Sequence, residues 1–164
     1  MPIITLAEAK KADILHRGDL VFVNWYPDAR ELAQRLIVDN QKNFRKLPAP
    51  ACYMQHVLVI THPDGGAIPG AAQAWKGWSM QPWRGREVDI EREYYDCELW
   101  IKRYTGWHDD AQRYEYCDRV IKECHVWYSF IGCIHMALGL FPKLPGGRFC
   151  SESAELPAEE MGIN

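Results

Sequence analysis

The 164 residues suffice for one domain, and a composition of 48% hydrophobic and 25% charged residues is ordinary for a globular protein. The net charge of −3 and the lack of a basic stripe argue against a nucleic-acid binder that grips phosphates. No run of about 18 apolar residues occurs, so we expect no integral membrane segment.

The N-terminal stretch MPIITLAEAKKAD lacks the basic region followed by a hydrophobic stretch that defines a secretion signal. The six cysteines are spread along the chain, which favours reduced thiols over a disulfide framework. We therefore expect a cytoplasmic protein, or one delivered without a cleavable signal peptide. No cofactor is indicated, and Cys117, Cys124 and His125 lack the CxxC spacing typical of zinc sites, so we expect no metal. The sequence leaves the oligomeric state open.

The first third of the chain alternates helix and strand signals. Thr5 to Glu8 has the form of a capping box, which predicts a short helix directly after it. Asp19 is expected to cap the turn before an apolar strand rather than to act in catalysis. Asp28 to Glu31 repeats the capping logic and opens a longer helix, which Pro48 ends. The predicted elements are a helix over 6–14, a strand over 20–23 and a helix over 28–45.

The middle of the chain reads as strands. Tyr53 to Thr61 is the strongest strand signal, because four apolar residues follow one another within it. The turn residues from Pro63 to Gly66 predict that the next segment returns as a paired strand. Pro82, Gly85 and mixed charges indicate a loop or a weak strand after that. The predicted elements are strands over 53–61 and 70–78, a loop or weak strand over 79–93 and a strand over 98–104.

The last third of the chain is predicted to be mainly helical, with one rigid loop between the helices. Asp109 opens a helix with Tyr116 and Val120 on one stripe, and a small apolar segment over 132–140 predicts another helix. A Pro/Gly-rich loop then precedes Cys150, where a further helix is expected to begin. We predict a single α+β domain over 1–164, a small, mainly antiparallel sheet packed against helices.

Cys150 and His56 are the candidate catalytic pair. A thiol at a helix N-terminus faces unpaired backbone N–H groups and the positive end of the helix dipole, which favour the thiolate. A histidine on a rigid strand is well held as a general base for such a thiol. The alternative for any single cysteine is a buried core residue.

Three short motifs in order, GDLVFV, HVLVI and FCSE, resemble those of the circularly permuted papain-like hydrolases. That group is related to the NlpC-type peptidases and the lecithin:retinol acyltransferase-like proteins. The resemblance covers roughly residues 17 to 155 and implies a papain-like fold in which the histidine precedes the cysteine. It also implies that Cys150 is the nucleophile and His56 the base.

The resemblance further implies a third polar residue on the strand after the histidine strand, and Gln73 matches best. A glutamine can accept a hydrogen bond from the imidazole and fix its tautomer; a solvent-facing strand glutamine is the alternative. Two features depart from the pattern: Pro157 follows soon after the cysteine, which favours a short or kinked helix, and Leu58 stands where glycine is common.

Trp75, Trp78 and Trp83 follow the proposed third residue closely. They form either ordinary core and rim packing or an aromatic wall for a substrate. We therefore expect a thiol-dependent amide hydrolase, with a peptidoglycan-type peptide as the substrate implied by the resemblance. Its alternatives are a lipid acyl hydrolase or acyltransferase on the same fold, and a non-catalytic binding or virion-associated module. The expected partner is thus a peptide or lipid-like small substrate.

Overall fold

A computed structural model describes the backbone of most of the chain. The described residues are 4–12, 14–25, 32–43, 46, 48–49, 51–62, 76–80, 84–94, 96–122 and 150–163. The helix predicted over 132–140 and the first residues of the helix predicted over 28–45 lie outside these ranges.

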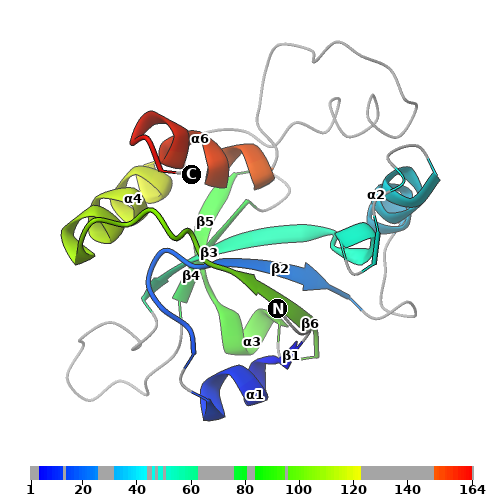
Figure 1. Ribbon diagram of the computed structural model, residues 1–164. Coiled ribbons are helices and arrows are strands. Elements are labelled where there is room, and N and C mark those ends of the chain that lie inside the picture. The colour runs from blue at the N-terminus through cyan, green and yellow to red at the C-terminus, as the bar shows by residue number, and fades with distance from the viewer. Residues whose placement is uncertain are drawn as a thin grey trace.

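The described residues form a six-stranded antiparallel sheet with the strand order β1-β6-β2-β3-β4-β5. This confirms the α+β class and the antiparallel sheet predicted from the sequence. Figure 1 shows the longer strands crossing the centre of the molecule with helices around them. The strands are β1 (Ile4–Thr5), β2 (Leu20–Asn24), β3 (His56–His62), β4 (Lys76–Met80), β5 (Gly85–Asp89) and β6 (Glu98–Lys102).

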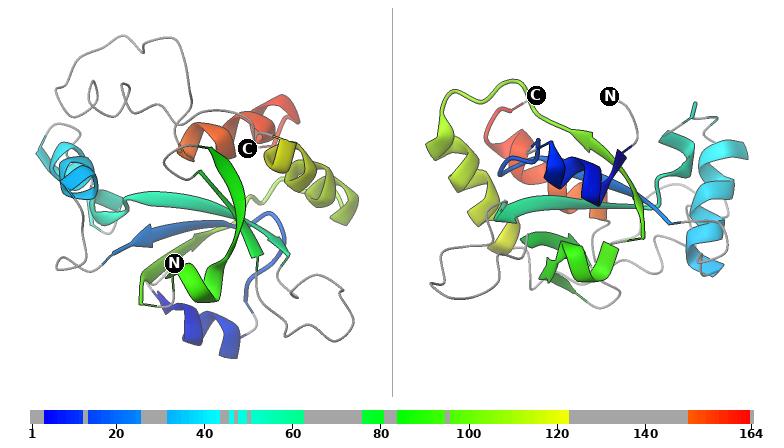
Figure 2. Two further views of the ribbon diagram at one scale, coloured as in Figure 1. Left: turned by 180° about the vertical axis from the view of Figure 1, so that it is seen from behind. Right: turned by 90° about the horizontal axis from the view of Figure 1, so that it is seen from below.

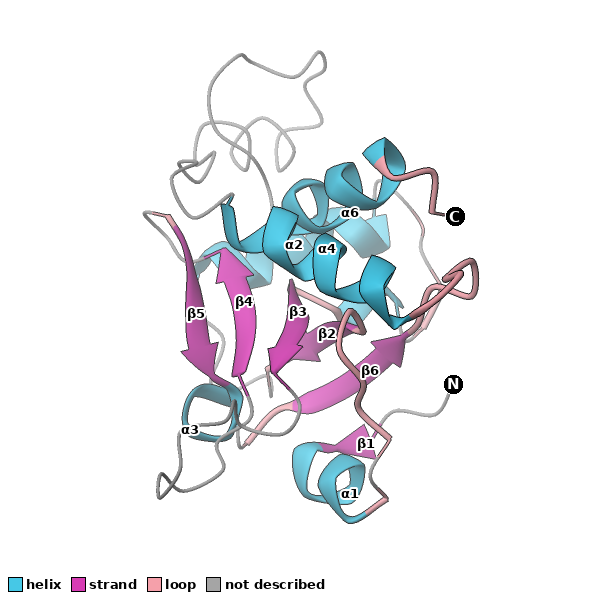
Figure 3. Cartoon of the chain, turned by 90° about the vertical axis from the view of Figure 1, so that its left-hand side faces the viewer, coloured by secondary structure: helices cyan, strands magenta, loops and turns pink. Residues whose placement is uncertain are grey.

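Helices cover both faces of this sheet, so each face has its own apolar core. Helices α4 and α6 lie on one side and α1 and α3 on the other (Figure 3). The remaining helical segments, α2 and the 3-10 helix η2, lie beyond the end of the sheet where β3 begins (Figure 2). The bounds are α1 (Leu6–Lys11), α2 (Leu32–Asn43), η2 (Ala51–Tyr53), α3 (Ile90–Tyr94), α4 (Asp110–Lys122) and α6 (Cys150–Glu160).

Strand alternation assigns each side chain to one of these two faces. On β3, Val57 and Val59 join the core with α4 and α6, which we call the α4/α6 face. Leu58 and Ile60 join the core with α1 and α3, which we call the α1/α3 face. Because all four side chains are buried, each contributes about 1.5–3 kcal/mol by leaving water. This explains the continuous apolar run that made β3 the strongest strand signal.

Two of the predicted helix starts are capped as expected, whereas the capping motif predicted at Asp28 to Glu31 lies outside the described residues. The Thr5 amide donates to the Glu8 carboxylate at 2.7 Å and the Glu8 amide donates to the Thr5 hydroxyl at 3.3 Å, which is a reciprocal capping box. Asp109 Oδ1 accepts from the Gln112 amide at 2.8 Å and caps α4 in the same way. Local side-chain chemistry therefore fixed both helix starts as expected.

One segment differs in part from the prediction. Residues 79–93 were expected to form a loop or a weak strand; the strand alternative matches β5, whereas the helix α3, which begins at Ile90, was not expected. Strand β5 pairs with β4 over five residues, so its conformation depends on a neighbouring strand rather than on its own apolar pattern. Asp89 Oδ1 accepts from the Arg92 amide at 3.2 Å and supports the start of α3.

Asp19 joins the start of β2 to the end of β6. Its carboxylate is fully buried and accepts two hydrogen bonds from Arg103, at 2.6 and 2.7 Å. It also accepts from the His16 amide at 2.8 Å, which is the turn cap expected from the sequence. A buried carboxylate in such a bidentate pair is retained only because its partners replace water.

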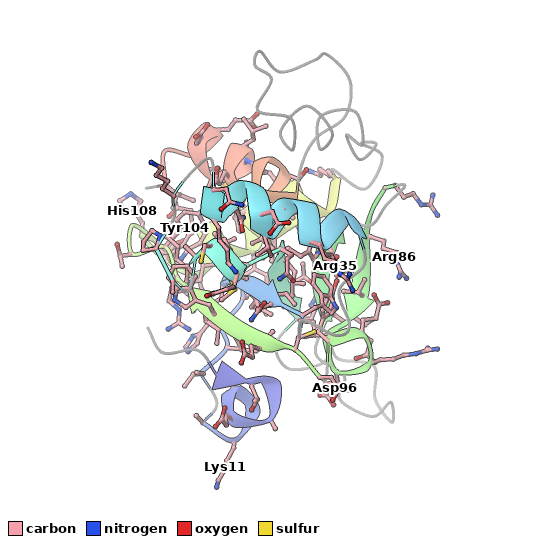
Figure 4. The ribbon with its side chains drawn as sticks, turned by 90° about the vertical axis from the view of Figure 1, so that its right-hand side faces the viewer. Lys11, Arg35, Arg86, Asp96, Tyr104 and His108 are labelled. Atoms are coloured by element: carbon pink, nitrogen blue, oxygen red, sulfur yellow. The ribbon has the colours of Figure 1, made fainter. Side chains whose placement is uncertain are left out.

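Several charged side chains lie at the periphery of the described structure. Lys11 on α1, Arg35 on α2 and Arg86 on β5 are exposed at separate places on the surface (Figure 4). None of the helices in the described ranges is both long and apolar enough to cross a membrane.

Candidate active site

His56 is the first residue of β3, and its side chain lies on the α1/α3 face. It pairs in register with Val23 of β2, which belongs to that core, whereas the next residue, Val57, packs on the α4/α6 face. Strand alternation therefore directs the imidazole toward α3.

A chain of two hydroxyls holds one nitrogen of the His56 ring. Nε2 lies 2.7 Å from Ser79 Oγ, and Ser79 Oγ lies 3.0 Å from the hydroxyl of Tyr94. Ser79 is on β4, the neighbouring strand, and Tyr94 is the last residue of α3. Both Ser79 and Tyr94 are buried. Among the described residues, the other ring nitrogen, Nδ1, has no hydrogen-bond partner.

Aromatic rings surround the imidazole. The Trp25 ring centroid lies 5.9 Å from that of His56, and the Tyr94 ring stacks on His56 at 6.2 Å and 18°. Trp25 and Tyr94 also contact each other, with centroids 5.7 Å apart. Burial in these apolar surroundings lowers the pKa of His56 to about 4, because the charged form loses its hydration. The ring is therefore neutral near pH 7.

A second polar group lies at the same end of the sheet. The Gln55 amide accepts from the Trp25 backbone N–H at 2.9 Å and donates to Asn24 Oδ1 at 3.0 Å. Asn24 in turn donates to the Glu98 carboxylate at 2.6 Å. These bonds tie β2, β3 and β6 together and hold the backbone of Trp25 next to His56. Both Asn24 and Gln55 are buried, so the network satisfies groups that have left water.

Cys150 begins α6, as the sequence predicted. A short or kinked helix was expected here; the helix has 11 residues and continues past Pro157 to Glu160, so it does not end at the proline. Ala154 and Ala158 pack against β3 on the α4/α6 face. The Cys150 end of α6 is the end nearer the start of β3 (Figures 1 and 2). The Cys150 side chain lies outside the described residues.

The start of α6 at Cys150 and the start of β3 at His56 lie toward the same end of β3. However, α6 packs on one face of β3, whereas the His56 ring leaves the strand on the other face. Gln73, Trp75 and Trp83 lie outside the described residues. Trp78 is a residue of β4 that pairs with Val59, and its side chain is not described.

Sequence reasoning missed Ser79, Tyr94 and Trp25. Ser79 fell just beyond the strand predicted over 70–78, and Tyr94 lay next to a segment expected to be a loop. The only signal was indirect: a strand that pairs with the histidine strand must place a residue beside the imidazole. The Leu58–Ser79 register selects Ser79, and register is set by tertiary pairing.

The described cysteines other than Cys150 are poor nucleophiles. Cys52, Cys97 and Cys117 are free thiols, and all three are buried. Burial raises the pKa of Cys97 and of Cys117 to about 12. The described residues contain no group of three His, Cys, Asp or Glu side chains placed to hold a metal ion.

No protein-family model matches the chain, and no curated protein matches it.

Proposed function

We propose that this chain is a papain-like thiol hydrolase of the permuted type that cleaves an amide, with Cys150 as nucleophile and His56 as general base. The observation that carries the proposal is that α6 begins at Cys150 and runs along β3, the strand that begins with His56. The first turn of a helix supplies unpaired N–H groups that stabilise both a thiolate and a developing oxyanion.

His56 is unprotonated near neutral pH, because burial lowers its pKa to about 4. The same burial makes the ring a weaker base than a free imidazole, so the proposal rests on its position on β3 and not on its basicity. With Nε2 engaged by Ser79, the nitrogen left to accept a proton is Nδ1. Trp25 and Tyr94 restrict the ring to one orientation.

The proposed reaction has two steps. His56 accepts the thiol proton while the Cys150 sulfur attacks the carbonyl carbon, and the Cys150 backbone N–H stabilises the oxyanion. The C–N bond then breaks as His56 returns the proton to the leaving amine, which leaves a thioester. A water molecule, deprotonated by the same ring, hydrolyses the thioester and restores the thiol. A peptidoglycan-type peptide is the substrate class that the motif resemblance favours.

A specific observation favours a second candidate, a non-catalytic binding module that keeps this fold. The His56 ring leaves β3 on the α1/α3 face, and Ser79, Tyr94 and Trp25 account for its packing there. In that case His56 is a buried structural histidine and Cys150 reacts independently of it.

The rate of alkylation at Cys150 separates the two candidates without knowledge of the substrate. We expect iodoacetamide near neutral pH to label Cys150 before Cys97 and Cys117, whose raised pKa values leave on the order of one thiolate in 10,000 or fewer. If His56 is the base, His56→Ala slows labelling of Cys150 and shifts its pH dependence upward. The matched control, Cys52→Ala, leaves the rate at Cys150 unchanged.

A turnover assay then identifies the bond that is cleaved. Release of free amine or acid is measured over a panel of muropeptides and lipid esters, for wild type, Cys150→Ala and His56→Ala. We expect amide turnover that both substitutions abolish, because the pair acts as one unit. Ester turnover alone would point to the lipid acyl chemistry. Equal alkylation rates in wild type and His56→Ala, together with binding but no turnover, would establish the binding module.

A further inference from the structure

The hydroxyl pair beside His56 deepens the proposed function, on which this inference rests. We propose that Ser79 and Tyr94 are positioning residues that keep the proton of His56 on Nε2 and thereby present Nδ1 as the basic nitrogen. The pair would serve the orienting role that the sequence analysis assigned to Gln73, a residue outside the described ranges.

The geometry of the contact supports this assignment. The 2.7 Å separation between His56 Nε2 and Ser79 Oγ is short for a hydrogen bond that involves a nitrogen. Both residues sit on paired strands of the sheet, so the separation is set by the register rather than by a flexible loop. Ser79 is fully buried, so the serine side of the contact is shielded from competing water, while the His56 side chain is partly exposed.

Tyr94 extends the chain by a second hydroxyl. Its hydroxyl lies 3.0 Å from Ser79 Oγ, so it can accept the serine proton and leave a serine lone pair for the proton on Nε2. The run from imidazole N–H to serine to tyrosine is then continuous, and each hydrogen bond polarises the next. The same tyrosine stacks on the imidazole, so it restrains the plane of the ring as well as its proton.

The function of a base depends on this choice of tautomer. A neutral imidazole with its proton on Nδ1 offers only Nε2 as an acceptor, and Nε2 already faces Ser79. Only the Nε2–H form leaves a free lone pair for the thiol proton. In a related arrangement, loss of the residue that fixes the histidine tautomer lowers kcat by as much as about 10,000-fold.

The test is nitrogen NMR of histidine-labelled protein in the absence of substrate. In wild type near neutral pH we expect the His56 spectrum of a ring protonated at Nε2, with an N–H signal protected from exchange with water. Ser79→Ala should lose that protection, Tyr94→Phe should weaken it, and Ser79→Thr should restore it because it keeps a hydroxyl. Tyr116→Phe removes another buried hydroxyl, bonded to the Ala154 carbonyl at 2.8 Å, and should leave the His56 signals unchanged.

Turnover gives the second readout. Ser79→Ala should lower kcat at least about tenfold with little change in KM, since the base and not the binding surface is affected. Tyr94→Phe removes a single oxygen and replaces Ser79→Ala in this test if Ser79→Ala does not fold. A wild-type proton on Nδ1, or protection that survives Ser79→Ala, would overturn the assignment while leaving a Cys150 hydrolase possible. A protected Nε2–H without any turnover would instead refute the hydrolase and leave the hydroxyl pair as a structural contact.

Discussion

Burial of His56 predicts that acidification destabilises the folded protein by a calculable amount. The pKa of His56 is about 4 in the folded state, against an ordinary value of 6.5. Between these pH values the unfolded chain binds a proton at His56 that the folded chain does not. The contribution of the neutral ring to the free energy of unfolding is therefore complete above pH 6.5 and decreases as the pH falls toward 4. The 2.5-unit difference corresponds to about 3 kcal/mol in total, of which about 2 kcal/mol is lost between pH 7 and pH 5. These values are upper limits because the ring is partly exposed.

The assay is urea denaturation at pH 7, 6 and 5, comparing wild type with His56→Gln. Glutamine can still reach Ser79 but does not titrate. Between pH 7 and pH 5, the free energy of unfolding of the variant should therefore fall by about 2 kcal/mol less than that of wild type. His16→Gln controls for removal of an exposed imidazole. If the free energy of unfolding fell by the same amount with pH in wild type and in His56→Gln, the inference that the folded protein holds the ring in its neutral form would be refuted.

Three further substitutions test the fold by equilibrium denaturation. Arg103→Met should cost about 3–5 kcal/mol because it leaves the buried Asp19 carboxylate unpaired, and stability unchanged in this variant would refute the ion pair. Ser153→Ala should stabilise by about 1 kcal/mol, since the buried Ser153 hydroxyl has no hydrogen-bond partner among the described residues, and a loss of stability would show that it has one. Gly77→Ala should cost about 1–3 kcal/mol because its Cβ would lie 2.9 Å from Ile90 Cδ1, and a neutral result would contradict that packing.

Local chemistry explains what the sequence predicted well. The capping box before α1 involves residues three apart, and the apolar run in β3 is complete within one segment, so neither depends on distant parts of the chain. The same holds for the helix start at Cys150, which follows a Pro/Gly-rich loop. Each of these features can be read without knowing the sheet order.

Features that depend on pairing could not be predicted. Ser79 is placed beside His56 by the register between β3 and β4, and a shift of one residue would turn it to the other face. Tyr94 reaches the same place because α3 follows directly after β5, in a segment for which the sequence predicted a loop or a weak strand but no helix. The face on which His56 lies follows from alternation only once β2 and β3 are paired. The surroundings of His56 therefore could not be predicted from the sequence.

Buried polar groups are concentrated at the end of the sheet where β3 begins. From Val57 to Ile60, β3 is apolar on both faces, which is the ordinary composition of a central strand. At its start, polar side chains lie on both faces: the Gln55–Asn24 pair on the α4/α6 face and the His56–Ser79 pair on the other. Buried polar groups are costly unless paired, so two separate networks at one strand end exceed what packing alone requires. The Cys150 end of α6 lies toward this same end of β3, so the helix begins near the part of the sheet where buried polar groups are concentrated.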